Sequence, residues 1–149
     1  MTSMRISSPA FVDHGTIPPQ YTCDGEDISP PLNFENVPED AQSLTLIVED
    51  PDAPGKTWVH WVVVNIDPHI TRLHEDSVPM GGFEAMTDFG STGWGGPCPP
   101  SGPHRYHFKV YALDNKLDVT EDITRIEVER AMEGHILDKS ELIGIYSRE

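Results

Sequence analysis

The sequence predicts a mainly β fold in a single domain, and three observations favour it. Several short segments alternate between apolar and polar residues, which is the period of a strand with one buried face. The chain of 149 residues contains 12 glycines and 14 prolines, which favour turns and loops between these segments. Only one segment, towards the C-terminus, has the spacing of an amphipathic helix. At this length, one domain spanning residues 1–149 is the simplest organisation.

The first two predicted strands are apolar enough to lie at the centre of a sheet. The segment SLTLIVED (43–50) alternates and places Asp50 on the same face as three aliphatic residues. The segment TWVHWVVVNI (57–66) is apolar on both faces, as a central strand is. Strict alternation would put His60 on the face that carries Val62, Val64 and Ile66.

Two further strands are predicted in the C-terminal half of the chain. The segment HRYHFKVYALD (104–114) alternates, with His104 and Tyr106 on the same face as two apolar residues. The segment ELIGIYS (141–147) is a shorter alternating run and is expected to be the last strand.

One helix and one long loop region complete the predicted organisation. The helix is expected to follow Thr120, whose hydroxyl can cap its N-terminus, and to stop at Gly134. Residues 67–103 show little regular pattern and are expected to form long functional loops.

The charge of the chain excludes some classes of partner. The 25 acidic residues outnumber the 10 basic ones and give a formal net charge of −15. Such a surface repels a phosphate backbone, so we expect no nucleic acid as a partner. The first fifteen residues lack the apolar core of a secretory signal, and no apolar run reaches the ~18 residues of a membrane span. We therefore expect a cytoplasmic protein without stable membrane insertion.

The two cysteines, Cys23 and Cys98, allow two readings. Neither belongs to a CxxC motif, so zinc binding and thioredoxin-type chemistry have no support. In a cytoplasmic chain we expect two separate thiols. A disulfide or a redox role is the alternative.

Three segments contain residues suited to a functional site: CDGEDISPPL (23–32), EDPDAPGKTWVHW (49–61) and GGPCPPSGPHRY (95–106). Asp50 and Asp52 either only shape an Asp-Pro turn or also supply carboxylates to a site. His60 is either a satisfied core histidine or a ligand-binding residue. His104 and Tyr106 follow a loop stiffened by four prolines, which would hold them in place at low entropic cost.

Metal binding and hydrolysis have weaker support. Two histidines and a carboxylate can bind a metal ion, but here they have no diagnostic spacing. No G-x-S-x-G motif occurs, Ser101 lies in a Pro/Gly loop, and nothing in the sequence activates Cys98 as a nucleophile. We expect no metal, no cofactor and no catalytic residue.

Taken together, the motifs DPDAP, VHWVVVNI and GPCPPSGPHRY followed by FKVYALD resemble the phosphatidylethanolamine-binding protein family, in its short bacterial and archaeal Raf kinase inhibitor-like branch. The resemblance covers about residues 5–147. It implies a two-sheet antiparallel Greek-key β fold with one or two short helices near the C-terminus. It also implies that Cys23 and Cys98 lie in signature loops near a common pocket.

The resemblance further implies a small cavity for phosphate-like or carboxylate groups. The residues that match its positions are Asp50, Asp52, Pro54, His60, Gly96, Pro100, His104 and Tyr106. An anion in so acidic a protein needs local compensation. We expect His60 or His104 to take up a proton as the anion enters, with the two aspartates orienting the imidazoles.

The expected function is therefore non-catalytic binding or regulation. The ligand would be a phosphorylated or carboxylate-bearing small molecule, a phospholipid headgroup or a phosphoprotein. The alternative is an inhibitor of a protease or kinase that acts through surface loops. A third hypothesis is a hydrolase that uses the cluster of histidines and aspartates at the predicted site. The resemblance also suggests a homodimer.

Overall fold

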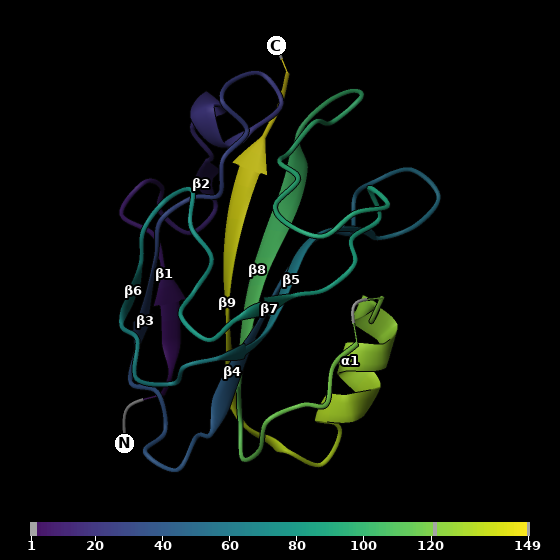
Figure 1. The fold of residues 1–149 in the computed structure, drawn as a ribbon. Coiled ribbons are helices and arrows are strands. Elements are labelled where there is room, and N and C mark those ends of the chain that lie inside the picture. Colours follow the sequence, from purple (N-terminus) through teal and green to yellow (C-terminus); the bar gives the residue numbers. More distant parts are fainter. Residues whose placement is uncertain (1–2, 121, 149) are drawn as a thin grey trace.

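The computed structural model describes residues 3–120 and 122–148, which form two β-sheets and one α-helix (Figure 1). The mainly β, two-sheet fold expected from the sequence is confirmed. A short 3-10 helix, η1 (Pro19–Tyr21), also occurs near the N-terminus, where no helix was expected.

The large sheet has six strands in the order β2-β9-β8-β4-β5-β7. Its four long strands are the ones predicted from alternation, although the last begins earlier than expected. They are β4 (Ser43–Asp50), β5 (Trp58–Ile66), β8 (His104–Leu113) and β9 (Ile136–Tyr146). The edges are the two-residue strands β2 (Gly15–Thr16) and β7 (Phe83–Glu84). The other pairings of named strands are antiparallel, whereas the short edge strand β2 pairs with β9 in parallel.

The small sheet has the order β1-β3-β6 and packs on one face of the large sheet (Figure 1). Its strands are β1 (Arg5–Ser7), β3 (Leu32–Glu35) and β6 (Arg72–Leu73), which are too short to show a clear period in the sequence. The main core fills the space between the sheets. Among its members are Ile6, Leu32, Phe34, Leu46, Val48, Trp61, Val63, Phe108 and Val110.

Helix α1 (Arg125–Met132) covers the opposite face of the large sheet and closes a second core (Figure 1). Its N-cap is Thr124, one turn later than the predicted cap at Thr120. The Thr124 side chain accepts a hydrogen bond from the amide of Glu127, and the Glu127 carboxylate accepts one from the Thr124 amide. The sequence T-x-x-E at residues 124–127 is the signature of a capping box, so the correct helix start could have been predicted from the sequence. In the part of the chain that is described, no helix is long and apolar enough to cross a membrane.

A β-bulge in β5 changes the direction of His60. Val48 pairs with Trp61, but the next residue of β4, Glu49, pairs with Val59, so His60 is the extra residue. Val62 and Val64 belong to the core under α1, whereas His60 packs against Tyr106 in the main core. The predicted face of His60 was therefore wrong, because a bulge interrupts the period of two.

Candidate functional site

A cavity of about 210 Å³ lies where the end of β4, the start of β8 and the loop around residues 95–100 meet. It contains six of the eight residues predicted for a site: Asp50, Pro54, His60, Pro100, His104 and Tyr106. The other lining residues are Ala53, Trp58, Phe89, Cys98 and Pro99. Most of this wall is proline or aromatic, so the few polar groups stand in largely apolar surroundings.

Asp50 and His104 form a buried pair in the cavity wall. The distance between His104 Nδ1 and Asp50 Oδ2 is 2.6 Å, and the two residues are only 6% and 3% exposed. A carboxylate only accepts hydrogen bonds, so the proton lies on Nδ1 and His104 is the donor. The second Asp50 oxygen, Oδ1, accepts the amide of Asp52 at 2.8 Å, which fixes the turn after β4.

His60 is held in a similar way by a backbone carbonyl. Its Nδ1 donates to the carbonyl oxygen of Gly95 at 2.6 Å. Its ring contacts Phe89 and Tyr106 edge-on, with centroids 5.3 and 5.2 Å away. Burial lowers the pKa of His60, and the Gly95 carbonyl and the Asp50 carboxylate oppose this only in part. His60 is therefore neutral in the empty cavity at pH 7, with Nε2 as its remaining nitrogen.

Tyr106 lies between the two histidines and keeps its proton. Burial raises its pKa well above the ordinary value, and the nearby Asp50 and Asp52 charges add to this, while a hydrogen bond from the Cys98 backbone opposes it. The Tyr106 hydroxyl is consequently a donor over the whole physiological pH range.

Asp52 does not line the cavity. Its carboxylate accepts three hydrogen bonds from Arg105, from the amide, Nε and one terminal nitrogen, at 2.8–2.9 Å. These bonds lower the pKa of Asp52 to about 2. The expectation that Asp52 orients an imidazole was wrong, because the guanidinium fork matches a carboxylate with two bonds and is the better partner.

Gly96 also lies outside the lining of the cavity. Its amide donates to Asp27 Oδ1 at 2.8 Å, so it is not free to bind a ligand. A Cβ at this position would overlap Asp27 Oδ1 and the carbonyl of Tyr21, which explains why a glycine is required. Its role is to bring the 95–100 loop close to the loop around residues 22–28.

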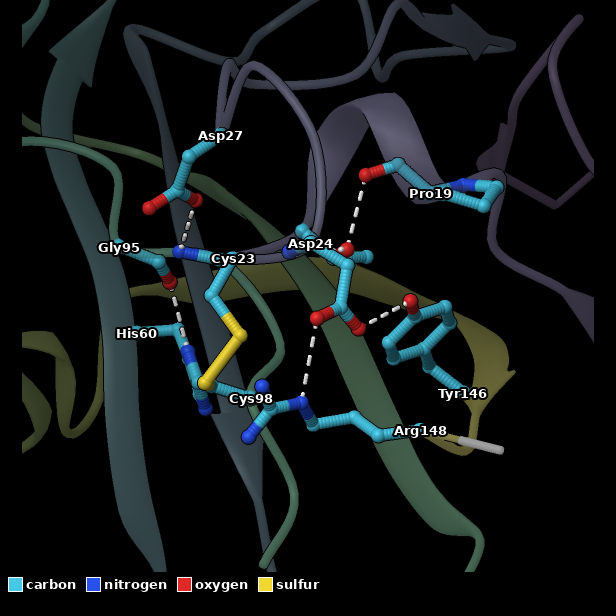
Figure 2. Close-up of a disulfide and its surroundings, with 11 residues drawn as sticks. Pro19, Cys23, Asp24, Asp27, His60, Gly95, Cys98, Tyr146 and Arg148 are labelled. Atoms are coloured by element: carbon cyan, nitrogen blue, oxygen red, sulfur yellow. Dashed lines mark hydrogen bonds and ion pairs between the residues drawn. A yellow bond between two sulfur atoms is a disulfide. The ribbon is translucent and has the colours of Figure 1, made fainter.

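Cys23 and Cys98 form a disulfide that joins the same two loops (Figure 2). The expectation of two separate thiols was wrong, and the alternative of a bridge is what the fold contains. The amide of Cys23 also donates to the carbonyl of Pro97 at 3.1 Å. Cys98 itself lines the cavity, so the disulfide ties a residue of the cavity wall to Cys23.

Sequence reasoning missed the aromatic part of the wall. Phe89 lies in the stretch without regular pattern, is 47% exposed, and packs edge-on against Trp58 and His60. Trp58, two residues before His60, was the one available signal. Among the described residues, no three His, Cys, Asp or Glu side chains come together as metal ligands.

Comparison with known proteins places this chain in a family. The family model of the phosphatidylethanolamine-binding proteins matches residues 7–147. A UPF0098 protein of Methanothermobacter thermautotrophicus is 50% identical over 150 residues, which cover 97% of this chain and 99% of the relative. A UPF0098 protein of Chlamydia pneumoniae is 44% identical over 150 residues, or 97% of this chain and 99% of that protein.

Two solved structures of this family have the same fold as this chain. A Chlamydia trachomatis structure, described as a phosphatidylethanolamine-binding protein homologue, is 40% identical with a TM-score of 0.96 and covers 100% of both chains. Escherichia coli YbcL, described as a member of the mammalian family, is 32% identical with a TM-score of 0.92 and covers 99% of this chain and 100% of that one. The chain therefore belongs to the phosphatidylethanolamine-binding protein family.

Proposed function

We propose that the chain is a non-catalytic binding or regulatory protein whose cavity holds a phosphate-like or carboxylate group. One observation carries this proposal: His60 and His104 line the same small cavity, and each has its Nδ1 hydrogen bonded to a fixed oxygen acceptor. Neither Nε2 has a hydrogen-bond partner among the described residues. Each imidazole thus has one nitrogen left for a ligand, and each is held in a single orientation.

Partners of the two carboxylates at the cavity reduce their repulsion of an anion in a chain with a net charge of −15. Asp52 is paired with Arg105, and Asp50 is hydrogen bonded to His104. Asp50, the one carboxylate among the described residues that line the cavity, is therefore already hydrogen bonded when an anion enters. Protonation of an Nε2 turns that nitrogen into a charged donor, and the Tyr106 hydroxyl adds a neutral one.

The size of the cavity limits what it can enclose. A volume of about 210 Å³ is small for a ligand site, so it suits an anionic group and not a whole lipid. One small anion should bind in the roughly micromolar to millimolar range, given the cost of association. A free phosphorylated molecule, a phospholipid headgroup and a phosphoprotein share this chemistry.

The residues that line the cavity also support a binding role. They include no serine, threonine or lysine, and the thiol of Cys98 is consumed in the disulfide. Of the other side chains that can act as nucleophiles, Asp50 is engaged by His104, and Tyr106 keeps its proton because burial raises its pKa.

The experiment is a titration followed by calorimetry and by NMR of the imidazole signals at pH 6 and 8. The ligands are phosphate, phosphoethanolamine and phosphotyrosine, and the proteins are the wild type, His104→Gln and the control His107→Gln. His107 lies on the same strand but pairs with Glu141 outside the cavity. We expect saturable binding that falls at least about tenfold in His104→Gln, or about 1.4 kcal/mol, and persists in His107→Gln.

Other outcomes would redirect the assignment. Equal binding by the wild type and His104→Gln would place the anion elsewhere. Absence of binding in every protein would favour an inhibitor that acts through the loops at 67–103. Turnover of a phosphoester that stops in His60→Ala would mean a hydrolase.

A further inference from the structure

The Cys23–Cys98 disulfide joins the wall of the cavity to a separate loop (Figure 2). These are the only two cysteines in the chain, and both are used. The bond spans 75 residues of sequence, so it is a tertiary link and not part of a local turn.

The two cysteines of the disulfide differ in their exposure to solvent. Cys98 is exposed and Cys23 is half-buried. Thiol–disulfide exchange begins with attack of a thiolate on one sulfur, and its rate depends on access to that sulfur. Exposed disulfides are also the ones that tend to be labile or regulatory, whereas protected ones are structural.

The segment that Cys98 belongs to positions both sides of the cavity. The carbonyl of Gly95 fixes His60, and the Cys98 backbone lies close enough to Tyr106 to oppose the rise in its pKa. Pro99 and Pro100, which follow directly, form part of the lining. A change in how Cys98 is anchored therefore reaches the groups proposed to hold the anion.

We propose that Cys23–Cys98 is a reversible thiol–disulfide site at which a dithiol reductant loosens the cavity wall and weakens anion binding. A thiolate of the dithiol attacks Sγ of Cys98, the more exposed cysteine, and the thiolate of Cys23 leaves. The second thiol of the reagent then displaces Cys98, so the reagent becomes a disulfide and the protein gains two electrons and two protons.

The rest of the contact between the loops makes the reaction reversible. The bond from the Cys23 amide to Pro97 and the bond from the Gly96 amide to Asp27 do not involve sulfur. They keep the two thiols near one another after reduction, so a disulfide oxidant can close the bond again. The effect on ligand rests on the proposed anion site, whereas the loosening of the wall does not.

The experiment compares the folded wild type before reduction, in excess dithiothreitol, and after reoxidation. Dithiothreitol is uncharged, and oxidised dithiothreitol serves as the control. The readouts are a free-thiol count, amide hydrogen exchange over residues 93–103, NMR signals of His60, and calorimetric titration with inorganic phosphate. The variant Cys23→Ser/Cys98→Ser should not respond to the reagent, and far-UV circular dichroism checks that each form stays folded.

We expect two thiols to appear without unfolding, faster exchange at residues 95–100, and phosphate binding weaker by about tenfold, as when the competent conformer falls to about a tenth of the molecules. Reoxidation should restore all three. A disulfide that resists dithiothreitol in the folded protein overturns the proposal, and so do unchanged exchange and affinity after reduction. If neither form binds phosphate, the proposed function fails, and the exchange rates and His60 signals alone decide whether the wall responds.

Discussion

The carboxylate of Asp50 and the imidazole of His104 are 2.6 Å apart, although 54 residues separate them in the sequence. Asp52, in the turn that follows β4, binds the next residue of β8 as well. Its carboxylate accepts hydrogen bonds from the backbone amide and the guanidinium of Arg105. The β4–β5 turn thus fixes the first two residues of β8 with two neighbouring carboxylates. The Asp50–His104 pair lines the cavity, and the Asp52–Arg105 pair, here called the outer pair, lies outside it.

The outer pair should contribute to stability in a pH-dependent way. The pKa of Asp52 is about 2 in the folded protein, below its unfolded value of about 3.9. A lowered carboxyl pKa stabilises the fold above the unfolded value, and the contribution is lost as the pH falls through the folded value. Because Arg105 is half-exposed, we expect Asp52→Asn to cost only about 1 kcal/mol at pH 7. Urea unfolding at pH 7, 4 and 3 should show this cost shrinking towards acid.

A double-mutant cycle provides the control for this pair. Asp52→Asn combined with Arg105→Gln should be little less stable than the less stable single variant, because each single change already breaks the ion pair between the side chains. Fully additive costs would show that the two side chains act independently.

The affinity for an anion should rise as the pH falls from 8 to 5.5. Burial lowers the pKa of His60, so the empty site is neutral there at pH 7. An anion near Nε2 favours the charged imidazole, so binding takes up a proton and tightens in acid. Sulfate is the best ligand for this measurement because, unlike phosphate, it does not titrate in this range. Calorimetry in buffers of different ionisation enthalpy measures the proton uptake directly.

A sulfate affinity that stays flat across this range, with no proton taken up, would contradict the proposed role of the imidazoles. His60→Gln should retain weak binding but lose the part of the pH dependence that belongs to His60.

The same lowered pKa predicts how the empty protein responds to acid. The unfolded chain binds a proton at His60 near pH 6.5, whereas the folded chain does so only at lower pH. Between the two values the unfolded state holds more protons, so stability falls as the pH falls. His60→Gln loses the hydrogen bond to Gly95, about 1 kcal/mol, at pH 7. We expect the gap between wild type and variant to narrow between about pH 7 and pH 5, as measured by thermal unfolding. A gap that widens in acid would refute the assignment of a lowered pKa.

The sequence was sufficient to locate the strands that carry the site. Alternation identified β4 and β8, and it placed His104 and Tyr106 on the buried face that they occupy. It could not give the orientation of His60, because a bulge exists only relative to the strand that pairs with it. An alternating segment predicts a face only for as long as the pairing register is unbroken.

The bonding partners of Asp52 and of the two cysteines could not be predicted from the sequence either. Asp52 was expected to face an imidazole, but the nearest cation in the folded chain is Arg105, and a guanidinium binds a carboxylate better. The two cysteines gave no spacing signal, since they meet only when the loop before β3 and the loop before β8 come together. Both results depend on tertiary contacts that no local pattern encodes.

Two threonines compete as the N-cap of α1: Thr120, predicted from the sequence, and Thr124, found in the structure. Thr124 caps α1, whereas Thr120 only donates its hydroxyl to Asp122. Replacing a capping threonine by alanine costs about 1 kcal/mol, so Thr124→Ala should destabilise the protein by that amount. Thr120→Ala is the matched control and should change stability by less than about 0.5 kcal/mol. Chemical unfolding of both variants decides between them, and a larger loss in Thr120→Ala would mean that the helix begins a turn earlier.

The exposed side chain of Phe89 should give the cavity a preference for anions that carry an aromatic ring. Phe89 touches His60 and Trp58 edge-on at the mouth of the cavity and remains 47% exposed. A ligand with an aromatic ring next to its phosphate could pack there, and such contacts contribute about 0.5–1.5 kcal/mol. We therefore expect Phe89→Ala to weaken phosphotyrosine binding by up to about tenfold while phosphate binding changes by less than about twofold. Met80→Ala, which truncates an exposed apolar side chain outside the cavity, is the control and should change neither affinity. Equal losses for phosphotyrosine and phosphate in Phe89→Ala would instead mean that Phe89 acts by holding His60 in place, because only then would the bare anion depend on it.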